Sequence, residues 1–237
     1  MSVVDFHSHV LPGIDDGSKN VEMSREMLAR IKASGVDTVV ATPHFYGSRR
    51  TLAEFLDRRR RAIERLYAAV PKEDMPQLRI GAEVAFYSGL LRENGEHIEK
   101  LCIDGTRTLL LEMPFSVWTD FEINEVASLC LDYKLNVVIA HIERYQSFET
   151  REMKEKLLRL PVYLQINSGT LLPWRGRKEW LRMFGEGQAK LLGSDCHNLT
   201  DRSPNLAEGR EILRKKLGDG VLQRIDKTAE ELLKPVR

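Results

Sequence analysis

The chain has 237 residues, of which 42% are hydrophobic and 30% are charged, as in an ordinary globular protein. A formal net charge of +1 provides no general field toward nucleic acid, and no apolar run is long enough to cross a bilayer. The three cysteines are an odd, widely spaced set, which indicates a reducing compartment. We therefore expect a cytoplasmic protein that binds no nucleic acid and does not insert into a membrane.

Short apolar, β-branched segments recur along the chain, with helical patterns between them. Strands that alternate with helices predict a parallel α/β sheet, either open or closed into a barrel. No linker or internal repeat interrupts this pattern, so we expect residues 1–237 to form a single domain. The expected strands are 3–6, 37–42, 78–82, 108–111, 136–140, 162–166 and 190–193.

Capping patterns mark where several helices begin and end. Thr51 and Glu54 have the spacing of a capping box, which predicts a helix that starts just after Thr51. Pro204, which follows a serine, is expected at the first position of another helix. The helical pattern over 204–233 is interrupted at 218–220, which predicts two helices there.

The first strand leads directly into two histidines, His7 and His9. Residues two apart on a strand point to the same side, so both imidazoles can reach one centre. Asp15 and Asp16 follow a Pro-Gly turn that can bring a carboxylate back to that centre. Asp16 is our candidate, although the neighbouring Asp15 could take its place. Imidazole and carboxylate ligands together suit Zn, Fe or Mn.

Each later strand also ends in a side chain that can bind a metal or donate a hydrogen bond. Five of the six histidines stand at strand ends, which is not expected of scattered core histidines. The C-terminal ends of the strands carry the active site in parallel α/β barrels, so we expect these side chains to cluster there. The candidate metal ligands are His7, His9, Asp16, His44, Glu83, Glu112, His141, Asp195 and His197.

A single catalytic metal needs about three protein ligands, so this set suits three ions that share bridging carboxylates. Glu83 and Glu112 are the natural bridges, because a carboxylate offers two oxygens and an imidazole only one free nitrogen. Four carboxylates against three divalent cations leave a positive pocket, which favours an anion such as phosphate.

These motifs resemble the PHP (polymerase and histidinol phosphatase) superfamily. The stretches at 7–17 and 165–169 are similar, more specifically, to the bacterial metal-dependent tyrosine phosphatases of capsule and exopolysaccharide operons. The resemblance extends from residue 3 to about residue 205 and rests on His7-x-His9, Thr-Pro-His44, Leu-Glu112, Ala-His141-x-Glu-Arg144-Tyr and Ser-Asp195-x-His197-Asn.

The resemblance implies a distorted (β/α)7 barrel with a trinuclear metal site, Mn foremost and Fe, Zn or Mg as alternatives. It implies hydrolysis of phosphotyrosine on a cognate, autophosphorylating bacterial tyrosine kinase. Arg144 and Arg202 match the family by position, and an arginine fork can bind phosphate oxygens in pairs. His44 or Asp195 could protonate the departing phenolate. One departure is Ile142, where the family has proline.

Other readings of the same residues remain open. The nearest is a histidinol-phosphatase-like enzyme that acts on a small molecule, and others are a nuclease or a metal-stabilised binding module without turnover. Cys196 and Arg202 also form a Cys-x5-Arg pattern typical of thiol-based phosphatases, although a thiolate loop would not contain the acidic Asp201. The sequence gives no indication of the oligomeric state.

A basic run at 58–61 follows Arg49 and Arg50. Such a run is usually a solvated helix face, and the alternative is a docking surface for an acidic phosphorylated tail. Aromatic residues also follow the expected ligands and could wall a pocket or pack in the core: Phe45, Tyr46, Phe115, Trp118 and Tyr145.

Overall fold

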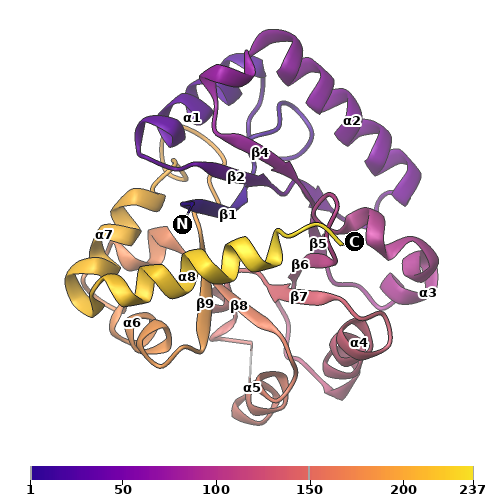
Figure 1. Ribbon diagram of the computed structural model, residues 1–237. Helices are drawn as coiled ribbons and strands as arrows, with labels where there is room; N and C mark the ends of the chain where they lie inside the picture. Colours follow the sequence, from indigo (N-terminus) through magenta and orange to yellow (C-terminus); the bar gives the residue numbers. More distant parts are fainter. Residues whose placement is uncertain (1, 149, 237) are drawn as a thin grey trace.

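Parallel strands form a central ring that is surrounded by helices (Figure 1). The computed structural model describes residues 2–148 and 150–236. Every strand pairing in these ranges is parallel, so the predicted α/β class is confirmed. The strands are β1 (Val4–Ser8), β2 (Thr38–Ala41), β3 (His44–Phe45), β4 (Gln77–Ile80), β5 (Glu83–Ala85), β6 (Thr108–Glu112), β7 (Asn136–Ile139), β8 (Tyr163–Asn167) and β9 (Ala189–Gly193).

The strands form two sheets, in the orders β1-β2-β4 and β3-β5-β6-β7-β8-β9. β3 and β5, which the sequence did not predict, continue the lines of β2 and β4 after short breaks. Pro43 lies in the first break and lacks the N–H group that a continuous ladder needs. Gly81 lies in the second, where the absence of a side chain weakens a strand.

The first and last strands lie side by side and bring the two ends of the ring together. Ser8 forms an isolated parallel bridge with Cys196. The backbone N–H of His9 donates to the carbonyl of Cys196 at 2.9 Å, and that of Asp195 donates to the carbonyl of His7 at 2.8 Å. The ring is therefore held at this seam by a few hydrogen bonds, not by a continuous ladder.

Helices pack around the outside of the ring (Figure 1). The Thr51–Glu54 capping box is present, and the predicted break lies at Gly218, whose φ is +81°. The helix expected to begin at Pro204 begins at Leu206 instead. The helices are α1 (Val21–Ala33), α2 (Leu52–Ala69), α3 (Leu90–Asn94), α4 (Asp120–Leu131), α5 (Arg151–Leu158), α6 (Lys178–Gly185), α7 (Leu206–Leu217) and α8 (Asp219–Leu232), with 3-10 helices at Lys72–Asp74, Gly95–Leu101, Ile142–Tyr145 and Ser168–Leu171.

The interior of the ring is filled by alternate strand residues, because neighbours on a strand point to opposite faces. Helix α8 crosses the ring at the N-terminal ends of the strands, where the Thr108 hydroxyl donates to the Leu232 carbonyl at 2.7 Å (Figure 1). The opposite, C-terminal edge is thereby left for the site. The interior cluster includes Val4, Phe6, Val40, Leu110, Val138, Ala140 and Leu191, with Ala229 and Leu232 of α8.

Within the described ranges, every helix is too short or too polar to cross a bilayer.

Candidate metal centre

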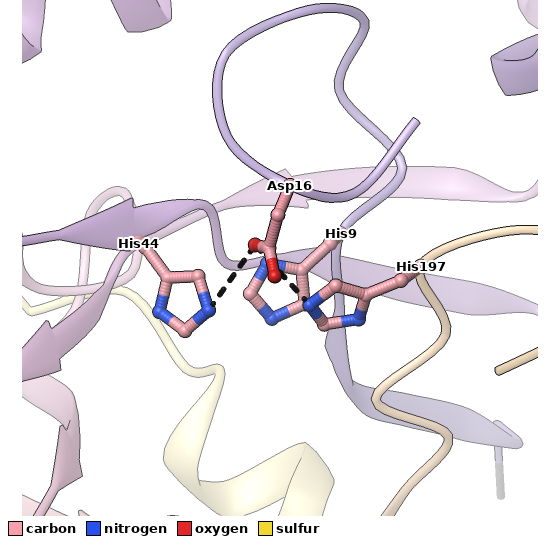
Figure 2. A group of neighbouring side chains, drawn as sticks. All are labelled: His9, Asp16, His44 and His197. Atoms are coloured by element: carbon pink, nitrogen blue, oxygen red, sulfur yellow. Dashed lines mark ion pairs between the residues drawn. The ribbon is translucent and has the colours of Figure 1, made fainter. Parts of the chain in front are cut away.

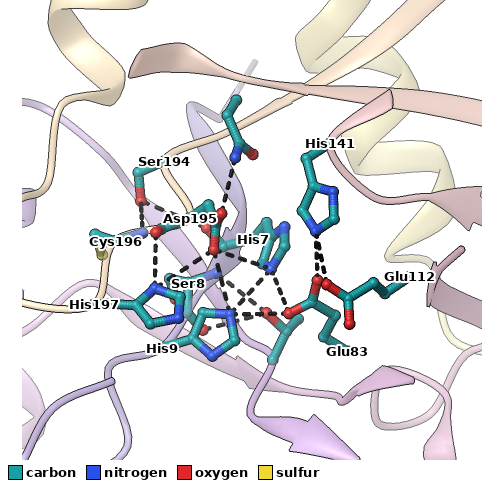
Figure 3. Close-up of polar contacts among 12 residues, drawn as sticks. His7, Ser8, His9, Glu83, Glu112, His141, Ser194, Asp195, Cys196 and His197 are labelled. Carbon is teal, nitrogen blue, oxygen red and sulfur yellow. Dashed lines mark hydrogen bonds and ion pairs between the residues drawn. The ribbon is translucent and has the colours of Figure 1, made fainter. Parts of the chain in front are cut away.

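The predicted ligands meet at the C-terminal edge of the ring; Figure 3 shows seven of them, and Figure 2 shows Asp16 and His44 beside His9 and His197. His7 lies on β1, Glu83 begins β5 and Glu112 ends β6, while most of the others stand in the loops that follow strands. Eight of the nine side chains are at most 9% exposed, whereas the side chain of Asp16 is 65% exposed. The cluster is therefore buried, except at Asp16, where it is open to solvent.

Glu83 lies in the middle of the histidines. Its Oε2 is 3.2 Å from Nε2 of His7, 3.1 Å from Nε2 of His9 and 3.1 Å from Nδ1 of His44. Its Oε1 is 2.8 Å from Nε2 of His141. Two ligand atoms bound to one metal at about 2.1 Å stand roughly 3.0–3.4 Å apart, so this spacing is that of a shared coordination shell.

Asp195 is the second shared carboxylate. Its Oδ1 is 3.4 Å from Nε2 of His9 and 3.5 Å from Nδ1 of His197. Asp195 and His141 both have positive φ values, +51° and +30°, although neither is glycine. Such backbone costs about 1–3 kcal/mol per residue and concentrates at functional sites, where it directs side chains that regular geometry would misplace.

The two neighbouring aspartates have different surroundings. Oδ1 of Asp16 is 3.5 Å from Nε2 of both His44 and His197 (Figure 2). Asp15 instead accepts from Nδ1 of His9 at 2.8 Å and from the backbone N–H of His44 at 3.0 Å. The geometry therefore favours Asp16 as the ligand, with Asp15 orienting two of the histidines from behind.

Eight of the nine side chains fall into groups that could each hold an ion. In three groups, the ligand atoms all lie within 4.8 Å of one another. His141 belongs to none of these groups but lies next to them. Its Nε2 is 2.8 Å from Oε1 of Glu83 and 3.4 Å from Oε1 of Glu112. The groups are His9, Asp16, His44 and His197; His7, His9 and Asp195; and His44, Glu83 and Glu112.

The donor set fits metal ions on two further grounds. Buried polar atoms are almost always hydrogen-bonded, yet Oε2 of Glu83, Oδ1 of Asp195 and Nε2 of His197 have no such partner among the described residues. In two of the histidines the other ring nitrogen is occupied: Nδ1 of His7 lies 3.2 Å from Oε1 of Gln165, and Nδ1 of His197 lies 2.9 Å from the Asp195 carbonyl. Such outer contacts fix the tautomer that leaves Nε2 free for a metal.

Electrostatics within the cluster keep the carboxylates ionised. Burial would raise the pKa of Glu83, but the imidazoles of His7 and His44 and a hydrogen bond from His141 together hold it well below its usual value. Burial would lower the pKa of His141, but hydrogen bonds to Glu112 and Glu83 raise it to about 10. The carboxylates thus require cations, which are either imidazolium groups or metal ions.

The two predicted arginines differ in their relation to the cluster. Nη2 of Arg202 donates to Oδ2 of Asp195 at 2.7 Å. Arg144 is exposed, and its guanidinium carbon lies 4.7 Å from the centre of the Phe115 ring, which stacks on His141. Arg202 is therefore part of the cluster, and Arg144 stands at its rim.

Cys196 lies in the wrong environment for a nucleophile. Its side chain is fully buried, and burial raises the pKa of the thiol to about 12. A thiolate is the reactive form, and nucleophilic cysteines have a lowered pKa in a partly exposed, electropositive site. The Cys-x5-Arg pattern therefore does not represent a thiol-based phosphatase loop.

Two supporting residues received no role from sequence reasoning. Gln165 accepts the backbone N–H of His141 at 2.8 Å, in addition to its contact with His7. Asp5 accepts the backbone N–H of Ser194 at 2.8 Å and so ties the first strand to the loop that carries Asp195. A signal for Asp5 is present in the sequence, because residues two apart on a strand share a face and Asp5 precedes His7 by two.

Comparison with known proteins agrees with this geometry. The family model described as "Capsular polysaccharide synthesis, CpsB/CapC" matches residues 3–234. The tyrosine-protein phosphatase CpsB of Streptococcus pneumoniae is 32% identical over 232 residues, which cover 91% of each chain.

Solved structures show the same architecture. A crystal structure of YwqE from Bacillus subtilis and CpsB from Streptococcus pneumoniae, described as metal-dependent tyrosine phosphatases, has a TM-score of 0.78 at 25% identity and covers 99% of this chain and 100% of that one. Histidinol phosphate phosphatase from Lactococcus lactis, with zinc, L-histidinol and phosphate, shares the fold at a TM-score of 0.57 and 17% identity, over 90% of this chain and 93% of that one. The chain therefore belongs to the CpsB/CapC family of capsular polysaccharide synthesis.

Proposed function

We propose that this protein is a metal-dependent protein tyrosine phosphatase. The observation that carries the proposal is the convergence of nine imidazole and carboxylate side chains, with Glu83 and Asp195 in their midst, at the open edge of the ring. The names of the relatives support the reaction: CpsB is a tyrosine-protein phosphatase, and the solved structures are described as metal-dependent.

The metal ligands in this proposal are the nine residues predicted from the sequence. They are sufficient for three ions, with Mn as the first candidate and Fe, Zn or Mg as alternatives. When bound, such ions supply Lewis acidity toward phosphate oxygens and lower the pKa of water that attacks phosphorus. Glu83 and Asp195, each beside several histidines, would be the shared ligands, whereas Glu112, which the sequence suggested as the second bridge, pairs with His141 at 3.4 Å.

Two arginines complete the binding of the phosphate. Arg202 is fixed by Asp195 beside the cluster and presents its remaining N–H groups to phosphate oxygens. Arg144, at the rim beside Phe115, would contact the phosphate from that side. A guanidinium is suited to this role because its planar donors match pairs of phosphate oxygens.

The departing tyrosyl oxygen needs little help, because a phenol has a pKa of about 10 and is a good leaving group. Burial raises the pKa of Asp195, but His7 and His9 reverse the effect and hold it well below the usual value, so this carboxylate is ionised and a poor acid. His44 lines the cavity beside the cluster, but burial lowers its pKa and it is itself one of the proposed ligands, so neither group is a strong acid and the phenolate can leave unassisted.

The natural substrate in this proposal is a bacterial tyrosine autokinase of capsule or exopolysaccharide synthesis, dephosphorylated in the cytoplasm. The family description supports the pathway, since it names capsular polysaccharide synthesis. The three free cysteines are in keeping with a reducing compartment.

The test is phosphate release from a phosphotyrosyl peptide with Mn²⁺, with and without a chelator, alongside a phosphoseryl peptide and histidinol phosphate. Turnover of phosphotyrosine alone, lost with chelator and restored by Mn²⁺, is the expected result. Turnover of histidinol phosphate alone would keep the site but make the enzyme a small-molecule phosphatase. Absence of turnover on all three, with metal bound by elemental analysis, would overturn the proposal in favour of a binding module.

A further inference from the structure

A cavity of about 360 Å³ opens beside the metal cluster. His44 and Asp16, which belong to the cluster, are among its lining residues, and the ring of Tyr46, stacked on His44 with centroids 4.8 Å apart, forms part of its wall. Arg49 and Arg50 line the same cavity. A group whose phosphate lies at the cluster would therefore extend past an aromatic wall toward two guanidinium groups.

The charges of Arg49 and Arg50 are not matched by acidic neighbours. No carboxylate oxygen of the described residues lies within 4 Å of either guanidinium, so neither forms an ion pair there. The Arg49 guanidinium carbon lies over Tyr46, 5.3 Å from the ring centroid. Arg50 acts only at longer range on the exposed Glu54, whose pKa is lowered mainly by hydrogen bonds from Thr51.

The basic run at 58–61 differs in this respect, because its arginines already form hydrogen bonds or ion pairs within the protein. Arg59 is buried and donates to the carbonyl of Gly81 at 2.8 Å, which is a structural contact. Arg60 pairs with Asp57 at 2.8 Å on the exposed face of α2. Of the two basic segments in the sequence, Arg49 and Arg50 are thus the ones available to a ligand.

A second cavity, of about 420 Å³ between α2 and α3, is also lined by Arg50. Lys100 adds another cation to its lining, while Glu93, the carboxylate among its lining residues, is paired with Arg92 at 2.9 Å. Because Arg50 lines both cavities, a peptide whose phosphotyrosine occupies the first would direct its neighbouring residues toward Arg49, Arg50 and the second cavity. Neighbouring residues of an extended peptide stand about 3.3–3.6 Å apart along the chain.

We propose that Arg49 and Arg50 select phosphotyrosyl segments that carry an acidic side chain beside the phosphotyrosine. This inference rests on the proposed phosphatase function and specifies its substrate class. Guanidinium groups bind carboxylates through paired hydrogen bonds, and the two arginines have no such partner among the described residues. An acidic neighbour in the substrate would supply it, whereas a basic neighbour would be repelled.

The experiment compares two phosphotyrosyl peptides that differ only in having glutamate or glutamine on both sides of the phosphotyrosine. The readouts are kcat/KM with Mn²⁺ and, for the same peptides with a non-hydrolysable phosphotyrosine analogue, Kd. For the unmodified protein we expect a preference of about fivefold to tenfold for the acidic peptide, the sum of two exposed charge pairs. The preference should shrink as salt is raised.

The variants are Arg49→Ala, Arg50→Ala, the double variant and Arg49→Glu, with Arg60→Ala as the control that removes one positive charge from the exposed face of α2. The ratio of kcat/KM for the acidic peptide to kcat/KM for the glutamine peptide should fall toward one in the double variant and below one in Arg49→Glu. It should stay unchanged in Arg60→Ala. The same ratio in the double variant and in the unmodified protein would overturn the inference about Arg49 and Arg50. Turnover of the peptides would in that case still support the proposed phosphatase function. If no peptide is hydrolysed, the phosphatase proposal fails. The ratio of the Kd values for the two peptide analogues still decides whether the two arginines favour peptides with acidic neighbours.

Discussion

Arg202 holds Asp195 from the side opposite the histidines. Its Nη2 donates to Oδ2 of Asp195 at 2.7 Å, whereas Oδ1 lies 3.5 Å from Nε2 of His7 and 3.4 Å from Nε2 of His9. Asn167 donates to the same Oδ2 at 2.8 Å. The two oxygens of one carboxylate are thus divided between Arg202 and the histidines, so a phosphate held by Arg202, as we propose, would lie next to the proposed metal ions.

Replacement of this arginine tests its place in phosphate binding. Arg202→Lys keeps the positive charge but removes the planar fork, so we expect kcat/KM for phosphotyrosine to fall about 10- to 100-fold, the scale of one to two charged hydrogen bonds. Metal content, measured by elemental analysis, should stay near that of the unmodified protein because Asn167 still holds Asp195. An unchanged kcat/KM would exclude Arg202 from the phosphate site.

The central carboxylate is the most sensitive position in the cluster. Glu83→Gln preserves shape but removes a charge and introduces N–H donors among the imidazoles of His7, His9 and His44. We expect loss of metal and a fall in turnover of at least about 100-fold, in the range that metal-site substitutions produce. Glu64→Gln, on the exposed face of α2, is the matched control and should retain both metal and turnover. Full metal content together with full turnover in Glu83→Gln would refute the bridging role.

The order of elements and the clustering of the candidate ligands were readable from the sequence because both follow from local rules. Strand residues alternate between two faces, and parallel strands end at one edge, so the positions of His7 and His141 in their strand patterns were enough to predict that they meet. The Thr51–Glu54 capping box is equally local, since both partners lie within one helical turn.

Other features depended on contacts between distant segments or on backbone conformation. Gln165 contacts His7 across 158 positions of sequence, which no local pattern encodes. The roles of Asp15 and Asp16 follow from the direction of a turn, and two adjacent carboxylates give no sequence signal to separate them. β3 was missed because Pro43 interrupts the strand pattern just before it.

The buried thiol beside the ligands provides a test between two mechanisms. Cys196→Ser should retain most of the phosphatase activity, because burial raises the pKa of this thiol to about 12 and leaves no thiolate near neutral pH. A modest loss of thermal stability is expected, since a hydroxyl replaces a buried thiol, and a melting curve measures it separately. Inactive Cys196→Ser protein with normal metal content and melting temperature would establish a thiol mechanism.

Binding of metal should release protons. Burial opposes the protonated form of both His9 and His141, but contacts with carboxylates raise the pKa of His9 well above its ordinary value and that of His141 to about 10. Without metal, both side chains are therefore charged imidazolium groups at pH 7, protonated on both ring nitrogens. One of these two protons must be lost before a ring nitrogen can bind a metal. Affinity for Mn²⁺ should rise with pH, by up to about tenfold per pH unit for each proton released.

Calorimetric titration of chelator-stripped protein with Mn²⁺, in buffers of different ionisation enthalpy at pH 7, counts these protons. We expect release of at least one proton per protein, and a smaller number in His141→Ala, which lacks one of the two protonated rings. His97→Ala is the matched control, because His97 is exposed on the 3-10 helix Gly95–Leu101 and should leave the proton count unchanged. Metal binding with no proton release, and with an affinity independent of pH, would show that these imidazoles are not ligands.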